Sequence, residues 1–453
     1  MPASDLRARL QRLRVQKIKR ELRSAPPVSP PPSRPRPPAI SSDLPGREIK
    51  TRLGAFQLVE NFYALDHQHG PLHFGDLFAH HSTTAARLAR DEALAGCDLR
   101  SLAFLDTETT GLAGGAGTLV FLVGLGLFEG DQFVLRQYFM RDPGEEEALL
   151  NTLVADLAGC AGWVTFNGRA FDLPLLETRL TMIGQRGALG RRAHLDLLHP
   201  ARRLYQRRLP SCKLGEIEHS IFHIIREQDD VPGELIPQMY LDYLRTGDPG
   251  DMRRVIYHNA MDVLSMVTLA THLLAVFSTQ FSERNPKSQD SIPNPQSPRE
   301  ASNLQSTREA SNPQPPLPNL QPEDLLRLAR WHDDNHRPAE AEVAYRRALD
   351  GQLPLEARRD GLTRLAALLK KQDRRAEAAP LWEQLASFTL DDPAPFTELA
   401  KFYEWRETDI LQAIAWTRRA LNIVSAWPRG WSRAEAVAAL QHRLERLQAK
   451  SHA

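Results

Sequence analysis

Two carboxylates spaced two residues apart mark the part of the chain where chemistry is concentrated. Asp106 and Glu108 end an apolar segment within the sequence LDTETTG at 105–111. Side chains alternate between the two faces of a strand, so both acids point the same way. A buried strand that ends in two acids on one side needs a partner for their charge. Because carboxylate oxygens suit Mg²⁺ or Mn²⁺, this pair predicts half of a divalent-cation site.

A third acid follows a second strand. The segment VTFNGRAFDLP at 164–174 is typical of a strand, an Asn-Gly turn and the start of a helix that carries Asp172. Asp is also a favoured helix N-cap, and Pro174 suits a first helical turn. Taken alone, the segment is therefore explained at least as well by a structural role for Asp172 as by a chemical one.

A fourth acid lies on a predicted helix, in VIYHNAMDVL at 255–264. Residues four apart share a helix face, so His258 lies beside Asp262. Tyr257, five residues before Asp262, is rotated roughly 140° away from it. His258 is thus the aromatic residue best placed to act with Asp262, although an amphipathic helix with a polar edge has the same pattern.

The acids need a sheet whose strand ends meet. Short apolar segments predict strands at 101–106, 119–127, 132–140, 163–167 and 194–198, with a turn at Gly130. Helices are predicted at 143–157 and 171–183, and the remainder to 276 is mainly helical. Three hairpin-linked strands followed by alternating helices and strands predict an α/β domain, with a mixed five-stranded sheet flanked by helices on both faces.

Composition divides the rest of the chain. The predicted regions are a basic, Pro-rich disordered arm at 1–46, an extension at 47–98 packed on the α/β domain at 99–278, a disordered linker at 279–321 and helical repeats at 322–450. The first 50 residues hold 12 Lys and Arg against 4 Asp and Glu. This excess of positive charge would attract a polyanion, but it is also typical of a solvated charged helix. The linker, rich in Ser, Asn, Gln and Pro, is predicted to let the repeats act independently.

Small residues recur in the C-terminal region. Ala341 is followed by equivalents at Ala378 and Ala413, spacings of 37 and 35 residues. This pattern resembles degenerate tetratricopeptide repeats, whose period is about 34 residues. The resemblance implies an all-α repeat domain that recruits a protein partner, and a plain helical bundle is the alternative.

A basic cluster follows the fifth predicted strand. Its members are Arg202, Arg203, Arg207, Arg208 and Lys213. Such a cluster suits phosphate contacts on a nucleic-acid strand, although a solvated basic helix explains it equally well. Asp196, at the end of that strand, is either a support for the acidic site or a structural strand-end acid.

Charge, cysteine content and apolar runs argue against several classes of protein. Net charge over 453 residues is +1, and the three cysteines form no CxxC pair, so a zinc ribbon is not expected. No uninterrupted apolar run reaches about 18 residues, which argues against a membrane span. The N-terminus lacks the apolar core of a secretory signal, although an Arg-rich transit peptide fits its composition. A cytoplasmic location is predicted.

Together the motifs resemble the DEDD exonucleases, the group that includes DnaQ-like proofreading domains. DTETTG at 106–111 matches the first motif of that group, and Asn167, Phe171 and Asp172 match the second. Asp262, preceded by an aromatic residue, matches the third. A finer resemblance is to the YprB-type ribonuclease H-like family, carried by FLDTETTGL, TFNGRAFDLPLLETR, HLDLLHPARRL, LPSCKLGEIE and HNAMDVLSM over about residues 95–278.

This resemblance implies a metal-dependent 3′→5′ exonuclease of ribonuclease H-like fold. The four acids Asp106, Glu108, Asp172 and Asp262 would hold two divalent cations, Mg²⁺ or Mn²⁺, with His258 as a catalytic partner. Contacts to the nucleic-acid strand would come from Thr109, Gly111, Asn167 and Phe171. The choice between DNA and RNA, and between exo- and endonucleolytic action, stays open.

One departure from the DEDD pattern bears on activity. One subgroup places Tyr four residues before the last Asp, and the other places His five residues before it. Here His258 stands at minus four and Tyr257 at minus five. An inactive ribonuclease H-like scaffold that binds nucleic acid, with the repeats as a protein dock, is therefore the competing hypothesis. The presence of all four acids favours catalysis.

Overall fold

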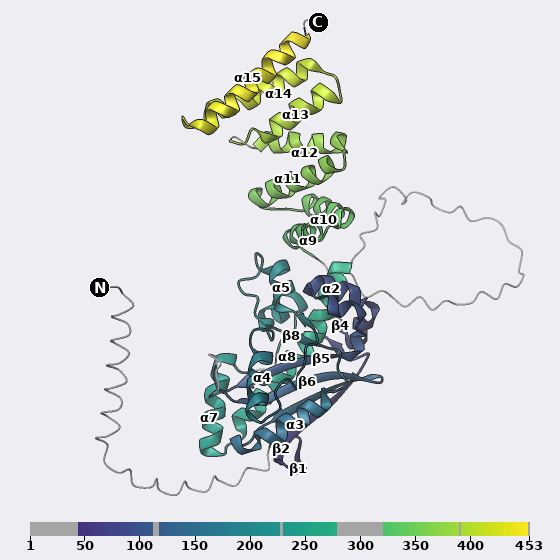
Figure 1. The fold of residues 1–453 in the computed structure, drawn as a ribbon, viewed down its shortest axis with the longest axis vertical. Helices are drawn as coiled ribbons and strands as arrows, with labels where there is room; N and C mark the ends of the chain where they lie inside the picture. The colour runs from purple at the N-terminus through teal and green to yellow at the C-terminus, as the bar shows by residue number, and fades with distance from the viewer. Residues whose placement is uncertain (1–43, 112–116, 227–229, 279–319, 389–390, 452–453) are drawn as a thin grey trace, which may run out of the picture.

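The computed structural model describes residues 44–111, 117–226, 230–278, 320–388 and 391–451. Nearly all of the predicted basic arm and of the predicted linker lies outside these described residues. The described chain forms an α/β domain followed by a stack of helices (Figure 1).

Seven strands form the main sheet, in the order β1-β2-β7-β6-β5-β8-β9. Five of them match the predicted strands: β5 (Leu102–Thr109), β6 (Val120–Glu129), β7 (Gln132–Phe139), β8 (Gly162–Thr165) and β9 (Ala193–Asp196). β5, β6 and β7 are antiparallel neighbours. β8 runs parallel to both β5 and β9, so the carboxyl ends of these three strands meet at one edge of the sheet.

The predicted mixed sheet flanked by helices is confirmed, but it has seven strands instead of five, because the N-terminal extension adds two more. β1 (Arg47–Thr51) and β2 (Gly54–Ala64) form a hairpin, and β2 pairs antiparallel with β7 from Gln57 to Ala64. This pairing provides hydrogen-bond partners for backbone groups along one edge of β7, which would otherwise be exposed and unpaired. β2 lacks the alternating pattern that identifies strands, since four consecutive residues from Phe56 to Val59 are buried.

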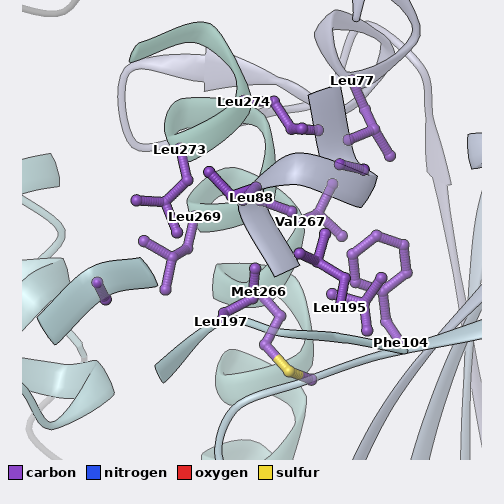
Figure 2. Close-up of a cluster of buried hydrophobic side chains, with 14 of the residues drawn as sticks. Leu77, Leu88, Phe104, Leu195, Leu197, Met266, Val267, Leu269, Leu273 and Leu274 are labelled. Carbon is purple, nitrogen blue, oxygen red and sulfur yellow. The ribbon is translucent and has the colours of Figure 1, made fainter. Parts of the chain in front are cut away.

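Helices cover both faces of the sheet. α8 (Gly250–Ser278) packs on one face together with η1 (Phe74–Ala79), α2 (Ser82–Ala89) and α5 (Leu198–Tyr205). Figure 2 shows this cluster, with Leu77 and Leu88 of the extension packed near Leu273 and Leu274 of α8. The other face carries α3 (Glu146–Asp156), α4 (Asp172–Met182) and α7 (Ile236–Thr246).

Short elements connect these layers. They are β3 (Gln68–His69), β4 (Leu72–His73), η2 (Glu92–Gly96), η3 (Leu99–Ser101), η4 (Pro143–Glu145), α6 (Leu214–Ile217), η5 (Glu218–Phe222) and η6 (Gly233–Leu235).

α8 is apolar and long enough to cross a membrane, with a mean hydropathy of 1.7 over its most apolar window. Among the described residues, α8 is the one helix with this property, and the sequence pattern had not predicted it. However, 78% of that window is buried within the domain, so the hydropathy of α8 is explained by its position in the core.

Seven helices follow the α/β domain in the described residues. They are α9 (Pro322–Asp334), α10 (Pro338–Asp350), α11 (Leu355–Lys371), α12 (Arg375–Phe388), α13 (Ala394–Trp405), α14 (Ile410–Ser425) and α15 (Trp431–Ser451). They stack side by side in chain order (Figure 1). The recurring residues Ala341, Ala378 and Ala413 are fully buried, which explains their small size. Their assignment as tetratricopeptide repeats stays a prediction.

The first helix of the stack shares a core with the α/β domain. Leu328 and Trp331 of α9 belong to the apolar cluster formed by α5 and α8, and the Trp331 ring centroid lies 4.8 Å from that of Phe277. Arg208 also forms a 3.1 Å ion pair with the buried Asp324. The expectation that the repeats act independently of the α/β domain is therefore wrong for α9.

Candidate active site

The first two acids extend the side of β5 that faces α8. Leu102 and Phe104 of β5 belong to the apolar cluster on α8, and the alternation of the strand continues to Asp106 and Glu108. The side-chain amide of Asn259, on α8, donates a 2.8 Å hydrogen bond to Asp106 Oδ2. The strand thus delivers both carboxylates to the helix that carries the third motif.

A buried amide chain fixes the orientation of Asn259. Gln137 Nε2, on β7, donates a 2.9 Å hydrogen bond to Asn259 Oδ1 and also binds the carbonyl oxygen of Ile256. Asn259 must then turn its donor toward Asp106. Gly124 makes room for this arrangement, since a Cβ there would lie 2.4 Å from Asn259 Oδ1.

Asp172 is the first residue of α4, not its N-cap. Thr107 Oγ1 donates a 2.6 Å hydrogen bond to Asp172 Oδ1, which ties β5 to the start of α4. The preceding turn places Asn167 at a φ of 71°. Asp196 holds this turn by accepting the N–H groups of Asn167 at 2.9 Å and Arg169 at 3.1 Å. Asp196 therefore supports the second motif through the backbone.

His258 lies beside Asp262, as the helical spacing predicted. Its Nε2 atom is 3.7 Å from Asp262 Oδ2, and its Nδ1 atom is 2.7 Å from Asp230 Oδ1. A carboxylate only accepts hydrogen bonds, so Nδ1 carries the proton in this contact. In the neutral ring, Nε2 then keeps a lone pair on the side of Asp262.

Arg226 brings a positive charge into the third motif. Its guanidinium forks onto Glu218 through two 2.6 Å hydrogen bonds and also donates to Asp262 Oδ1. It further lies 3.5 Å from Asp230 and 3.3 Å from His258. Glu218 and Arg226 are nearly inaccessible to solvent, so this network holds Asp262 and the Asp230–His258 pair in one arrangement.

Replacing Arg226 with Gln should destabilise the fold. The substitution leaves Glu218 and Asp262 without their cation, and breaking a buried ion pair costs about 3–5 kcal/mol. Urea unfolding in EDTA would measure the loss. The control is Arg245→Gln, which breaks an exposed ion pair with Asp242 and should cost less than about 1 kcal/mol. Equal losses in the two variants would contradict the network.

A cavity of about 610 Å³ opens beside the acids. Its lining includes Asp106, Glu108 and Asp172 and also the predicted strand contacts Thr109, Gly111, Asn167 and Phe171. Phe171 is 56% exposed, so its ring is available to a ligand. Gly233 lines the cavity as well, and a Cβ there would lie 3.9 Å from His258 Nε2, so His258 stands just behind that wall.

Burial, with a smaller part from neighbouring charges, raises the pKa of three carboxyl groups. Burial, followed by the charge of Asp262, raises the pKa of Asp106 well above its ordinary value. The same two causes raise the pKa of Glu108. Burial raises the pKa of Asp172 to about 6, despite the hydrogen bond from Thr107. The fold thus brings together acids that repel one another.

These oxygen donors fit a hard divalent cation, because such an ion would offset their repulsion. The acids are not arranged as a complete metal site. Across the described residues, no group of three or more His, Cys, Asp or Glu side chains is positioned to hold a metal. Asp172 is turned toward Thr107 and Asp262 toward Arg226. Cation binding would require these two side chains to reorient.

Without divalent cations, the ionisation of Asp172 should make the folded state less stable as pH rises. Its pKa is higher in the fold than the ordinary 3.8, so folding favours the protonated form. The contribution of Asp172 is therefore full below about pH 4 and is lost as pH rises through about 6, at up to about 1.4 kcal/mol per pH unit. Urea unfolding in EDTA would show the wild type losing stability relative to Asp172→Asn across that interval. Parallel pH profiles for the two proteins would contradict the raised pKa.

The structure divides the basic cluster after β9. Arg203 lies over the Trp331 ring at 5.2 Å, and Arg208 pairs with Asp324, so both face α9. Arg202, Arg207 and Lys213 are exposed. None of the five lines the cavity described above.

The comparisons with known proteins agree with this architecture. Residues 103–274, which span β5 to α8, match the RNase H superfamily and form a domain of that class. Over a longer stretch, the chain is similar to the uncharacterized protein YprB of Bacillus subtilis (strain 168). The two are 29% identical over 364 residues, which cover 80% of this chain and 79% of that protein.

Proposed function

We propose that this protein hydrolyses phosphodiester bonds of a nucleic-acid strand as a metal-dependent 3′→5′ exonuclease. The observation that carries the proposal is the convergence of Asp106, Glu108, Asp172 and Asp262, whose charges act on one another beside the cavity. A phosphodiester is itself an anion, so a cavity lined by acids can accept it only with cations present. Membership in the RNase H superfamily supports nuclease chemistry.

Each residue has a separate role in the proposal. The four acids would hold two divalent cations, Mg²⁺ or Mn²⁺, which when bound activate water and stabilise the leaving oxygen. His258, oriented by Asp230, would accept the proton of the attacking water at Nε2. Phe171 would stack on a base at the strand end, with Thr109, Gly111 and Asn167 contacting the sugar and phosphate.

The test is a nuclease assay on end-labelled single- and double-stranded DNA and RNA, with Mg²⁺ or Mn²⁺ and with EDTA as the control. Metal-dependent release of mononucleotides from the 3′ end is the expected result. Internal cleavage products would instead show an endonuclease, and the absence of hydrolysis on all four substrates would remove the catalytic proposal.

A non-catalytic nucleic-acid-binding scaffold is the second candidate. The contact between Arg226 and Asp262 favours it, because the guanidinium occupies one oxygen of a predicted metal ligand. Such a scaffold would bind a strand equally well in EDTA and in Mg²⁺, and would show no hydrolysis. A cytoplasmic location and a protein partner for the repeats remain parts of the proposal that rest on the sequence.

A further inference from the structure

Cationic side chains gather where the α/β domain meets α9. α5 begins directly after β9, whose carboxyl end lies at the same sheet edge as those of β5 and β8. Asp106 lies in the second half of β5, and Asp172 begins α4, which follows β8. Arg202, on α5, and Arg207, two residues after the end of α5, therefore follow in the chain a sheet edge at which acids of the cavity also lie.

α9 adds a further positive charge, Arg327, beside α5. Arg327 Nε donates a hydrogen bond to the carbonyl oxygen of Arg203, and its Nη2 atom lies 3.4 Å from that of Arg202. Both carbonyls belong to the last turn of α5. Carbonyl oxygens satisfy the N–H groups of Arg327 but do not cancel its positive charge.

Two acids near these cations are already paired with other arginines. Asp324 is paired with Arg208, and Asp360 is paired with Arg330. Among the ion pairs formed by the described residues, none joins Arg202, Arg207, Lys213 or Arg327 to a carboxylate. Burial, followed by the charges of Arg207 and Arg330, lowers the pKa of Arg327, which agrees with a position of Arg327 near these two arginines.

We propose that Arg202, Arg207, Lys213 and Arg327, here called the junction surface, bind the phosphate backbone of the nucleic-acid strand whose end enters the acidic cavity. This inference rests on the proposed function. Three of the four residues are arginines, whose planar fork matches phosphate oxygens. The first helix of the repeats is then part of the substrate-binding surface, instead of belonging to a separate protein dock.

Salt-dependent binding tests the junction surface without hydrolysis. The full chain carrying Asp106→Asn, which is expected to hydrolyse a strand too slowly to interfere, is titrated at a fixed Mg²⁺ concentration against a fluorescein-labelled single strand, at KCl concentrations between about 50 and 200 mM. Each phosphate contact to a single strand contributes about 0.7 to the slope of log affinity against log salt. The triple variant Arg202→Gln, Arg207→Gln, Lys213→Gln should therefore flatten the slope by about 2. Arg418→Gln, an exposed charge on α14, should leave the slope unchanged.

Arg327 needs two variants, because it also joins α9 to α5. Arg327→Lys keeps the charge but loses the fork onto the carbonyl groups, whereas Arg327→Gln loses both. A slope that is lowered by Gln and retained by Lys supports the phosphate contact. Equal slopes in the two variants would reduce Arg327 to a structural residue and overturn its part in the surface.

The remaining outcomes separate this inference from the proposed function. A parent chain that binds strands, combined with an unchanged slope in the triple variant, overturns the junction surface alone. A parent chain that binds neither DNA nor RNA strands overturns both. Tighter binding of poly-glutamate than of a strand would assign the surface to an acidic protein and also overturn the inference.

Discussion

Replacing Asp106 with Asn should reduce metal-dependent hydrolysis by at least about 10³-fold while leaving the fold intact. Asp106 stands at the centre of the acidic cluster, and loss of a shared ligand removes several kcal/mol of transition-state stabilisation, where each 1.4 kcal/mol is a factor of ten. The fold should survive because the Asn carbonyl oxygen can still accept the hydrogen bond from Asn259. Removal of one repelling charge should also raise the thermal midpoint in EDTA.

The matched control is Asp131→Asn, which removes an exposed acid from the turn between β6 and β7. It should change neither the rate nor the thermal midpoint. Initial rates on an end-labelled strand and thermal unfolding in EDTA are measured on the same preparations. Full activity in the Asp106 variant would rule out a metal mechanism at this cluster, whatever its stability.

Replacing His258 with Ala should lower the hydrolysis rate by about 10²–10⁴-fold, the usual effect of losing a general base. The reason is positional: Asp230 holds Nδ1, so Nε2 faces Asp262 at 3.7 Å and stands 3.9 Å from the position of a Cβ at Gly233 in the cavity wall. Tyr257→Phe should have a much smaller effect, because position 257 points to a different side of α8.

A substitution at Asp230 tests whether the orientation of the His258 ring matters for the reaction. Asp230→Asn should lower kcat with little change in KM, because the ring would lose the partner that fixes its tautomer. A larger loss in Tyr257→Phe than in His258→Ala would make Tyr257 the functional aromatic. In that case the similarity to the Tyr-containing subgroup of DEDD enzymes, and not helix geometry, would be the better guide.

Local patterns predicted most of the central fold. The strands that become β5 to β9 were found within a few residues, because each is short, apolar and bounded by turn residues. β1 and β2 were missed since β2 is covered on both faces and lacks alternation. The contact of α9 with the α/β domain was also missed, because the composition of a linker carries no information about where the chain returns.

The site shows the same division between local and long-range signals. Asp106, Glu108 and Asp172 were recognisable because each ends a strand or begins a helix in a characteristic motif. Arg226, Asp230 and Gln137 were not, because their partners lie 28 to 122 residues away in the chain. Only the three-dimensional structure shows that the guanidinium of Arg226 and the buried amides of Gln137 and Asn259 position these acids.

The strands β1 and β2 and the helix α9 determine how short a fragment of the chain can be and still fold. A fragment started at residue 99, where the α/β domain was predicted to begin, would lack β2 and would leave the whole length of β7 open to pairing with other molecules. A fragment stopped at 278 would uncover Phe277 where Trp331 now packs. We therefore expect a soluble minimal fragment to begin by about residue 44 and to include all of α9, so the folding unit is considerably larger than the family match from 103 to 274.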